Sequence, residues 1–342
     1  MKSTYKAVQI SQPGVLELVD RLVPTPGNGE VLLDVEACGI CGADKNDVDF
    51  VDPTVQPPRI PGHEVVGRIV EVGPNVPPMW KVGQRVGVGR LGGHCHECPQ
   101  CRQGNFHLCL QQKVLGVSCD GGYAEKMLAK ATGLVSIPDS LSSAMAAPLL
   151  CAGIATFNAL KKSGAQAGDL VAIFGIGGLG HLAIQYAKKM GFRVVAIGRG
   201  AQIADDVRML GAHIYINTDE VDAVSKLKSL GGAQVIMTTI TNGGASSGLV
   251  GGLAPQGKLV VVGVSKDPLV IPAGPMVGGE RVIQGAITGT PYESEKTLDF
   301  SLLADVRPLI ETMPLERAAE AFERAMSGQV TFRMVLTMSQ PE

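Results

Sequence analysis

The chain has 342 residues, which is more than one hydrophobic core usually organises, so two domains are expected. Its 30 lysines and arginines nearly balance 32 aspartates and glutamates, and a net charge of −2 argues against a nucleic-acid-binding protein. An apolar fraction of 45% and a charged fraction of 18% exclude a disordered chain. The most apolar stretch, 170–187, is interrupted by glycines, so we expect no membrane span and a cytoplasmic protein.

Residues 1–150 are predicted to form a compact, mainly antiparallel β domain with long loops. The runs 31–35 and 65–72 are short, rich in β-branched residues and bounded by proline and glycine clusters. Helical periodicity is nearly absent from this part of the chain.

The pattern changes near residue 144. Residues 144–160 predict one or two buried helices, interrupted or started at Pro148. Apolar strands then alternate with helices, as in an α/β fold whose parallel, doubly wound sheet is covered on both faces. This domain is expected over residues 151–291, and residues 292–342, with a helix pair and a strand at 332–338, are expected to return to the first domain. The six predicted strands are 170–174, 193–197, 214–216, 234–239, 258–263 and 282–286.

A glycine-rich turn joins the first of these strands to a helix at 181–189. A Gly-x-Gly-x-x-Gly string in this strand–turn–helix context indicates a dinucleotide-binding site. Gly175 permits the sharp turn, Gly177 lets the backbone approach a pyrophosphate, and Gly180 allows close packing of helix on strand. The alternative is a turn that binds nothing. The residues predicted to contact the cofactor here are Gly175, Gly177, Gly178, Leu179 and Gly180.

The end of the second strand indicates which dinucleotide is preferred. An NAD site usually offers an acidic residue there, but this chain has Gly198 followed by Arg199. An arginine pairs with a 2′-phosphate that a carboxylate would repel, so NADP(H) is favoured over NAD(H). The alternative is a solvated Arg199 beside a permissive NAD site.

Four of the eight cysteines lie within fifteen residues. Two successive Cys-x-x-Cys steps, and a fourth cysteine after seven more residues, allow four thiolates to converge on one tetrahedral zinc. Because such a site has no open position, we predict a structural zinc in a lobe at about residues 92–110. A zinc-ribbon nucleic-acid module is the competing interpretation, which the charge balance disfavours. The four residues are Cys95, Cys98, Cys101 and Cys109.

A second set of chemically competent residues is scattered along the chain: Cys41, the adjacent His63 and Glu64, and Cys151. Their spacing alone does not indicate a common site. Cys151 by itself could be a small apolar residue, and His63 could be a hydrogen-bonded loop histidine. Taken in order with the cysteine lobe and the glycine turn, however, the set resembles the zinc-dependent medium-chain alcohol dehydrogenases. The likeness covers essentially the whole chain, and its later stretches resemble the cinnamyl-alcohol-dehydrogenase-like and bacterial or yeast alcohol dehydrogenase branch.

This resemblance implies a GroES-like β domain and a Rossmann domain, with two zincs per chain. It implies that Cys41, His63 and Cys151 hold a catalytic zinc whose fourth position takes the substrate oxygen. Glu64 is implied to lie behind the zinc as a transient ligand, and Asp44 to orient His63 through its far ring nitrogen. The implied reaction exchanges hydride between an alcohol and NADP(H) in a homodimer or homotetramer.

One departure concerns the proton relay. Ala43 stands where the family usually has a serine or threonine that passes on the alcohol proton. If water, with Lys45, Asp47 or Asp49, takes over, a slower or substrate-shifted dehydrogenase results, since positioned acid–base help is worth about 10²–10⁴-fold. The alternative is a zinc- and dinucleotide-binding protein whose dehydrogenase chemistry is lost or redirected.

Two arginines complete the set of candidate residues. Arg90 precedes the cysteine lobe where relatives often have an aromatic or apolar pocket residue. There it would suit a polar or anionic substrate, or replace the lost hydrogen bond to the substrate oxygen; the alternative is a side chain turned to solvent. Arg333 matches a family position that contacts the cofactor's pyrophosphate.

Overall fold

The computed structural model describes residues 3–264 and 266–338. This chain divides into two compact units, which are described separately. The first runs through Cys151 and resumes at Gly289; the second is Ala152–Thr288. Cys151 therefore belongs to the first unit, one residue beyond the expected domain end, and the chain returns three residues before the expected position.

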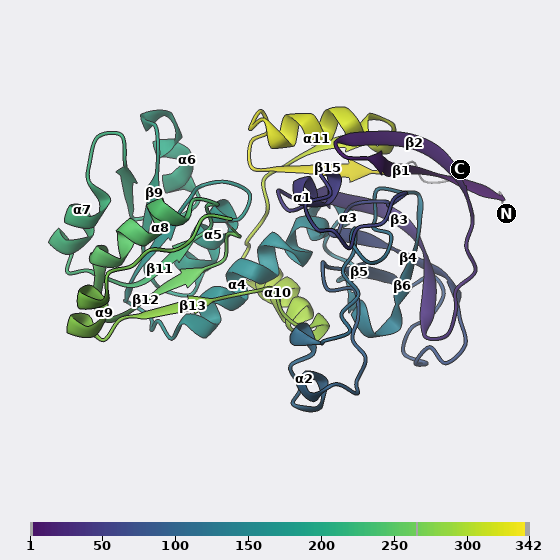
Figure 1. Cartoon of the computed structure of the whole chain (residues 1–342), viewed down its shortest axis with the longest axis horizontal. Coiled ribbons are helices and arrows are strands. Elements are labelled where there is room, and N and C mark those ends of the chain that lie inside the picture. Colours follow the sequence, from purple (N-terminus) through teal and green to yellow (C-terminus); the bar gives the residue numbers. More distant parts are fainter. Residues whose placement is uncertain (1–2, 265, 339–342) are drawn as a thin grey trace. The chain divides into compact units, whose positions relative to one another are not determined.

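The first unit is built on a largely antiparallel sheet (Figure 1). Strand β3 is central, because it pairs with β15, β4 and β6. The edge pair β14–β15 is parallel, and β1 and β2 form a separate antiparallel hairpin. Apolar side chains such as Leu33, Ile69 and Val86 fill the core. The strands are β1 (Thr4–Gln12), β2 (Val15–Leu22), β3 (Glu30–Ile40), β4 (Val65–Val72), β5 (Arg85–Val88), β6 (Lys126–Lys130), β7 (Leu134–Ser136), β14 (Ile310–Pro314) and β15 (Arg333–Thr337).

Short helices connect these strands. Proline at the first position and a capping box between Thr290 and Glu293 define the start of α10. Pro148 lies in the first turn of η3, where its missing N–H costs no hydrogen bond. The helices and 3₁₀ turns are α1 (Asp44–Val48), α2 (Pro99–Arg102), η1 (Phe106–Leu108), η2 (Ala131–Gly133), α3 (Ser143–Ala146), η3 (Ala147–Leu150), α10 (Pro291–Leu303), η6 (Leu315–Arg317) and α11 (Ala318–Met326).

In the second unit, the six strands found among the described residues are all parallel, in the order β10-β9-β8-β11-β12-β13. The chain starts in the middle at β8, moves to one edge and then builds the other half from β11 outward. This is the doubly wound sheet expected from the alternating pattern, and it confirms the α/β fold class. The strands are β8 (Leu170–Phe174), β9 (Arg193–Gly198), β10 (Ile214–Asn217), β11 (Ala233–Thr238), β12 (Leu253–Val261) and β13 (Val282–Gly285).

The helices of this unit pack on the sheet. Helices α4 and α5 touch through Phe157 and Tyr186, whose ring centroids lie 5.4 Å apart. No single helix in the described ranges is long and apolar enough to span a membrane; the bent pair Ser143–Leu150 and Ala152–Ser163 passes that test only when taken together. The helical elements are α4 (Ala152–Ser163), α5 (Gly180–Lys189), η4 (Ala201–Ile203), α6 (Ala204–Met209), α7 (Ala223–Ser229), α8 (Gly243–Gly248), η5 (Leu249–Gly252) and α9 (Ala273–Gly279).

Candidate active site and metal clusters

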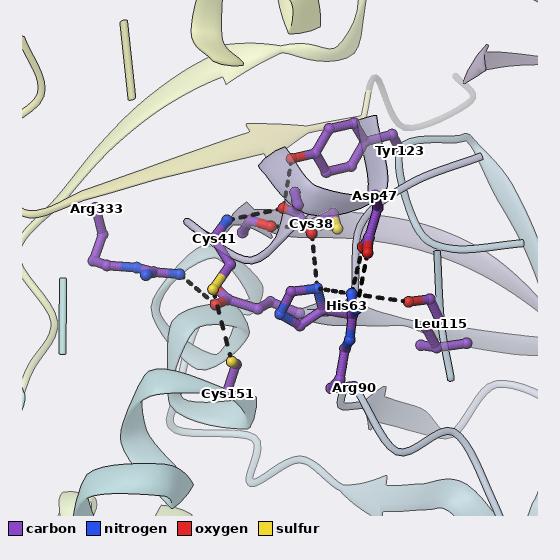
Figure 2. A network of polar contacts seen from close by, with 12 residues as sticks. Cys38, Cys41, Asp47, His63, Arg90, Leu115, Tyr123, Cys151 and Arg333 are labelled. Atoms are coloured by element: carbon purple, nitrogen blue, oxygen red, sulfur yellow. Dashed lines mark hydrogen bonds and ion pairs between the residues drawn. The ribbon is translucent and has the colours of Figure 1, made fainter. Parts of the chain in front are cut away.

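Four side chains that could ligate a metal, from three distant segments of the sequence, meet in the first unit. Three of them, Cys41, His63 and Cys151, are labelled in Figure 2. Cys41 directly follows β3, His63 and Glu64 directly precede β4, and Cys151 ends η3. One ligand atom from each lies within 4.8 Å of the other three. The Sγ atoms of Cys41 and Cys151 are 3.9 Å apart. Two thiolates on a tetrahedral zinc, with bonds of about 2.3 Å, would be about 3.8 Å apart, so this spacing fits zinc.

The His63 imidazole is held through its outer nitrogen. His63 Nδ1 lies 2.7 Å from Asp44 Oδ1. The other carboxylate oxygen of Asp44 accepts hydrogen bonds from the backbone N–H of Cys41 and from the Tyr123 hydroxyl, each at 2.9 Å. The inner nitrogen, Nε2, is buried and has no hydrogen-bond partner among the described residues. A buried ring nitrogen of this kind beside two thiols is what a metal ligand requires.

Glycine allows the backbone to approach this site. Gly62 has a φ of +97°, and a Cβ placed on it would lie 2.3 Å from the buried ring of Tyr123. Any other residue would therefore be both strained and in collision, and the loop that carries His63 would have to move. A Cβ on Gly39 would likewise lie 2.0 Å from Glu64 Oε2.

Glu64 and Arg333 form an ion pair that is almost fully buried. One oxygen of Glu64 accepts from Arg333, while Oε2 has no partner in the described part of the chain. Burial raises the pKa of Glu64 to about 7, although the Arg333 charge opposes this rise. Arg333 thus lies against Glu64; its contact with a cofactor pyrophosphate stays a prediction.

The protonation of each thiol and of the imidazole depends on the neighbouring groups. The hydrogen bond from Cys151 lowers the pKa of Cys41 well below its usual value, and the same bond raises the pKa of Cys151. Burial disfavours a charged His63, but Asp44 and the Cys41 thiolate overcome it and raise the pKa of His63 to about 10. A metal that binds here therefore displaces protons from the imidazole and a thiol.

Arg90 pairs with Asp47, and the sequence did not reveal this contact. Its Nη2 lies 2.9 Å from Asp47 Oδ1, and Nη1 binds the other carboxylate oxygen. Nη1 also lies 3.3 Å from the Leu115 carbonyl oxygen and 3.3 Å from His63 Nδ1. This pairing contradicts the alternative of an Arg90 side chain turned to solvent, whereas its contact with a substrate stays a prediction. The available signal was that Asp47 follows Asp44 by three residues, on the same face of α1.

Lys45 and Asp49, the other residues considered for proton transfer, lie at the surface. Ala43 caps α1 without any side-chain hydrogen bond. Lys45 and Asp49 form an exposed ion pair at 3.0 Å.

Cys119 lies outside both cysteine clusters, with its thiol 3.7 Å from the Val114 carbonyl oxygen, and burial raises its pKa to about 11.

The cysteine lobe holds a second, closed group. All four cysteines are free thiols, and their Sγ atoms lie within 4.8 Å of one another. Individual Sγ–Sγ distances are 3.6, 3.9 and 4.0 Å, again close to the edge of a zinc–thiolate tetrahedron. Backbone N–H groups of Cys98 and Cys95 point at the sulfurs of Cys95 and Cys109, each at 3.4 Å.

The glycine turn of the second unit has a different geometry at each glycine. Gly175 has a φ of +96°, as the sharp turn requires. A Cβ on Gly180 would lie 1.9 Å from the Gly175 carbonyl oxygen, whereas one on Gly177 would meet nothing within 4 Å. Gly178 and Leu179 immediately precede α5, with Leu179 as its N-cap. The open face at Gly177 lets a ligand approach the backbone at the start of this helix.

A cavity of about 820 Å³ lies beside this turn, within the second unit. Gly175, Gly198 and Arg199 are among its lining residues, and Arg199 is exposed. The nearby carboxylate of Asp219 is occupied by the backbone N–H of Gly200, at 2.9 Å. The two residues expected to select the dinucleotide thus lie together at the wall of one cavity.

Comparison with known proteins identifies the family. Residues 27–139 match the model of the alcohol dehydrogenase GroES-like domain, and residues 178–303 match that of the zinc-binding dehydrogenases. The chain is 40% identical over 339 residues to alcohol dehydrogenase notN of Aspergillus sp. (strain MF297-2), with 99% of each chain covered. The chain belongs to the zinc-dependent medium-chain alcohol dehydrogenases.

Two further members of this family are informative. NADP-dependent alcohol dehydrogenase C 1 of Mycolicibacterium smegmatis is 33% identical over 343 residues, with 98% of this chain and 97% of that protein covered. The crystal structure of CAD from Helicobacter pylori complexed with NADP(H) superposes with a TM-score of 0.88 at 26% identity, covering 98% and 99%. The resemblance inferred from the motifs is thereby confirmed, and the enzyme is an alcohol oxidoreductase. The alternative of lost or redirected chemistry is not favoured.

Proposed function

We propose that this alcohol dehydrogenase interconverts an alcohol with an aldehyde or ketone by hydride exchange with NADP(H), and that it binds two zinc ions per chain. The observation that carries the proposal is the convergence of Cys41, His63 and Cys151 in a chain of this family, with a free imidazole nitrogen between two thiols. The cytoplasmic location and the homodimeric or homotetrameric state expected from the resemblance stay predictions.

The catalytic zinc would be held by the Sγ atoms of Cys41 and Cys151 and by Nε2 of His63. Asp44 binds the outer nitrogen of His63 and thereby keeps Nε2 turned toward the thiols. Glu64 has one oxygen tied to Arg333 and the other free, which suits a transient ligand. When bound, zinc supplies Lewis acidity toward the substrate oxygen and the nicotinamide supplies or accepts the hydride.

Proton transfer takes an unusual route in this proposal. Ala43 has no hydroxyl, and Asp49 is paired with Lys45 at the surface. Water therefore carries the alcohol proton away.

The structural zinc would be held by the four cysteines of the lobe, because four thiolates close its coordination. These are Cys95, Cys98, Cys101 and Cys109.

The cofactor preference rests on the end of β9. No acidic residue occupies the position that binds an NAD ribose, and Arg199 lines the cavity beside the glycine turn. An exposed guanidinium there pairs with a 2′-phosphate through charge-assisted hydrogen bonds. The name of the Mycolicibacterium relative and the ligand of the Helicobacter structure agree with this preference.

Turnover tests the proposal directly. The zinc-loaded protein is offered a panel of aromatic and aliphatic aldehydes, and the loss of NADPH absorbance is followed. We expect reduction of at least part of the panel, with NADPH preferred over NADH. No turnover across the panel would instead support the loss of dehydrogenase chemistry.

Arg199→Ala tests the cofactor assignment. Because the variant loses the charge that faces the 2′-phosphate, KM for NADPH should rise by roughly tenfold or more while KM for NADH stays within about twofold. Arg208→Ala is the matched control, since Arg208 is an arginine of the same unit that pairs with Asp205 at 2.8 Å. Equal effects of Arg199→Ala on both cofactors would refute the 2′-phosphate role.

A further inference from the structure

A third group of potential ligands lies behind His63. One oxygen of Asp44, one oxygen of Asp47 and a ring nitrogen of His63 lie within 4.8 Å of one another, and all three side chains are buried. This spacing would suit a cation, yet the guanidinium of Arg90 already contacts Asp47 and lies against His63 (Figure 2). The chain therefore supplies the cation itself.

The position of this guanidinium is fixed on several sides. Both η nitrogens engage the Asp47 carboxylate, and Nη1 also lies 3.3 Å from the Leu115 carbonyl oxygen. Asp47 is only 1% exposed, and a Cβ on Gly116 would lie 3.0 Å from its Oδ2, so the carboxylate has little room to move. A planar, bidentate pair of this kind fixes direction as well as distance.

We propose that Arg90 is a positioning residue, held by Asp47, that fixes the His63 imidazole from the side opposite the two thiols. Its charge offsets that of the buried Asp47 carboxylate, and its fixed edge, 3.3 Å from Nδ1, limits rotation of the ring. Nε2 then stays directed toward Cys41 and Cys151. This inference rests on the proposed function, because Arg90 acts on the reaction only through His63.

The same contacts separate this role from direct recognition of substrate. Arg90 has five N–H donors, and three of them, two on Nη1 and one on Nη2, already face Asp47 and Leu115. A substrate anion would have to compete with a carboxylate that cannot leave without becoming a buried, unpaired charge. Arg90 is therefore expected to affect all substrates alike, whether neutral or anionic.

Cobalt substitution tests the proposal without turnover, because the visible ligand-field bands of Co²⁺ report the geometry of its ligands. In Arg90→Ala we expect altered bands, a metal affinity at this site lowered by roughly 10–100-fold, and a fall in kcat with similar KM for neutral and acid-bearing aldehydes. Arg90→Lys should be impaired almost as much, since a single ammonium cannot reproduce the bidentate contact. Arg324→Ala, which breaks an ion pair with Glu311 in the same unit, is the control and should leave the bands unchanged.

Chemical rescue gives a second, independent reading. Ethylguanidinium added to Arg90→Ala should restore the cobalt spectrum, because Asp47 still provides its partner. The double variant Asp47→Asn with Arg90→Ala leaves no unpaired carboxylate at position 47, so it should fold, yet it should show the altered spectrum and no rescue. This double variant keeps the test valid even if Arg90→Ala folds poorly.

Three results would overturn the proposal. Unchanged bands and metal affinity in both Arg90→Ala and the double variant, with only a lower Tm, would reduce the pair to a structural role. A KM increase confined to acid-bearing aldehydes would make Arg90 a substrate-binding residue. If the wild-type protein took up cobalt only in the cysteine lobe, the proposed function itself would fail, which differs from a failure confined to the Arg90 variants.

Discussion

The two cysteine-containing clusters of the first unit have nearly the same sulfur spacing and very different surroundings. In the lobe, four thiols face one another at 3.6–4.0 Å and backbone N–H groups point at their sulfurs. At the other site two thiols, 3.9 Å apart, lie beside the His63 imidazole. Its Nε2 is buried and has no hydrogen-bond partner among the described residues. Both groups fit zinc, but the first is closed by its own sulfurs and the second is not.

The surroundings also differ in charge. Two arginine–carboxylate pairs flank the three-ligand site: Arg333 with Glu64, and Arg90 with Asp47. Buried pairs of this kind contribute little net stability, so their presence points to orientation and electrostatics as their role. Two clusters with similar sulfur spacing can therefore suit different roles, one structural and one catalytic. The number of ligands and the charged groups behind them distinguish the two roles.

The largest expected effect comes from removing a ligand of the three-ligand site. Cys151→Ser should lower the zinc content from about two to one per chain and kcat by about 10³-fold or more, since a Lewis acid contributes several kcal/mol. Zinc analysis after dialysis and steady-state kinetics measure both. Cys119→Ser, a cysteine outside both clusters, should keep two zincs and full activity. Full metal content and activity in Cys151→Ser would remove the distinction between the two sites.

Removing a ligand of the lobe should lower thermal stability more than it lowers kcat. Cys101→Ser should also lose one zinc, but because we propose a structural role for this metal, the main result should be a Tm lower by several degrees. The kcat of the protein that remains folded should change by less than about threefold. A loss of kcat as large as that of Cys151→Ser, at a temperature where the variant is folded, would show that the lobe takes part in catalysis.

A smaller effect is expected where Tyr123 supports Asp44. Tyr123→Phe keeps the ring that packs against Gly62 but removes the hydroxyl that donates to Asp44 at 2.9 Å. The loss of one buried hydrogen bond should cost about 1 kcal/mol of unfolding free energy and weaken zinc binding a few-fold, with no effect on the lobe. Denaturant unfolding and competition with a chelator measure these changes, and Tyr5→Phe in β1 is the control. Equal weakening at both zinc sites would contradict a specific link through Asp44.

The smallest expected effect is a gain in the rate of alcohol oxidation. Ala43→Ser restores a hydroxyl at the start of α1, and alcohol oxidation should become a few-fold faster. One restored group should recover only part of the 10²–10⁴-fold that positioned acid–base catalysis supplies. Ala43→Gly, which adds no hydroxyl, should show no gain. Slower oxidation in Ala43→Ser would indicate that the present water route does better than the relay.

Much of this fold follows from local patterns. The runs 65–72 and 170–174 coincide with β4 and β8, because β-branched residues between glycine and proline turns have few alternatives. The lobe was equally accessible, since its ligands lie within one short segment. Cys41, His63 and Cys151 could be united only through resemblance, because no spacing rule connects residues brought together by a sheet. The Arg90–Asp47 pair was missed for the same reason: 43 residues separate two side chains that each look suited to the surface.

Anomalous diffraction at the zinc edge tests the central claim most directly. We predict two peaks per chain: one among the four lobe sulfurs, and one about 2.3 Å from the Sγ atoms of Cys41 and Cys151 and about 2.0 Å from His63 Nε2. A crystal of the zinc-loaded enzyme with the lobe peak at full occupancy, and no peak between those three side chains, would contradict the account.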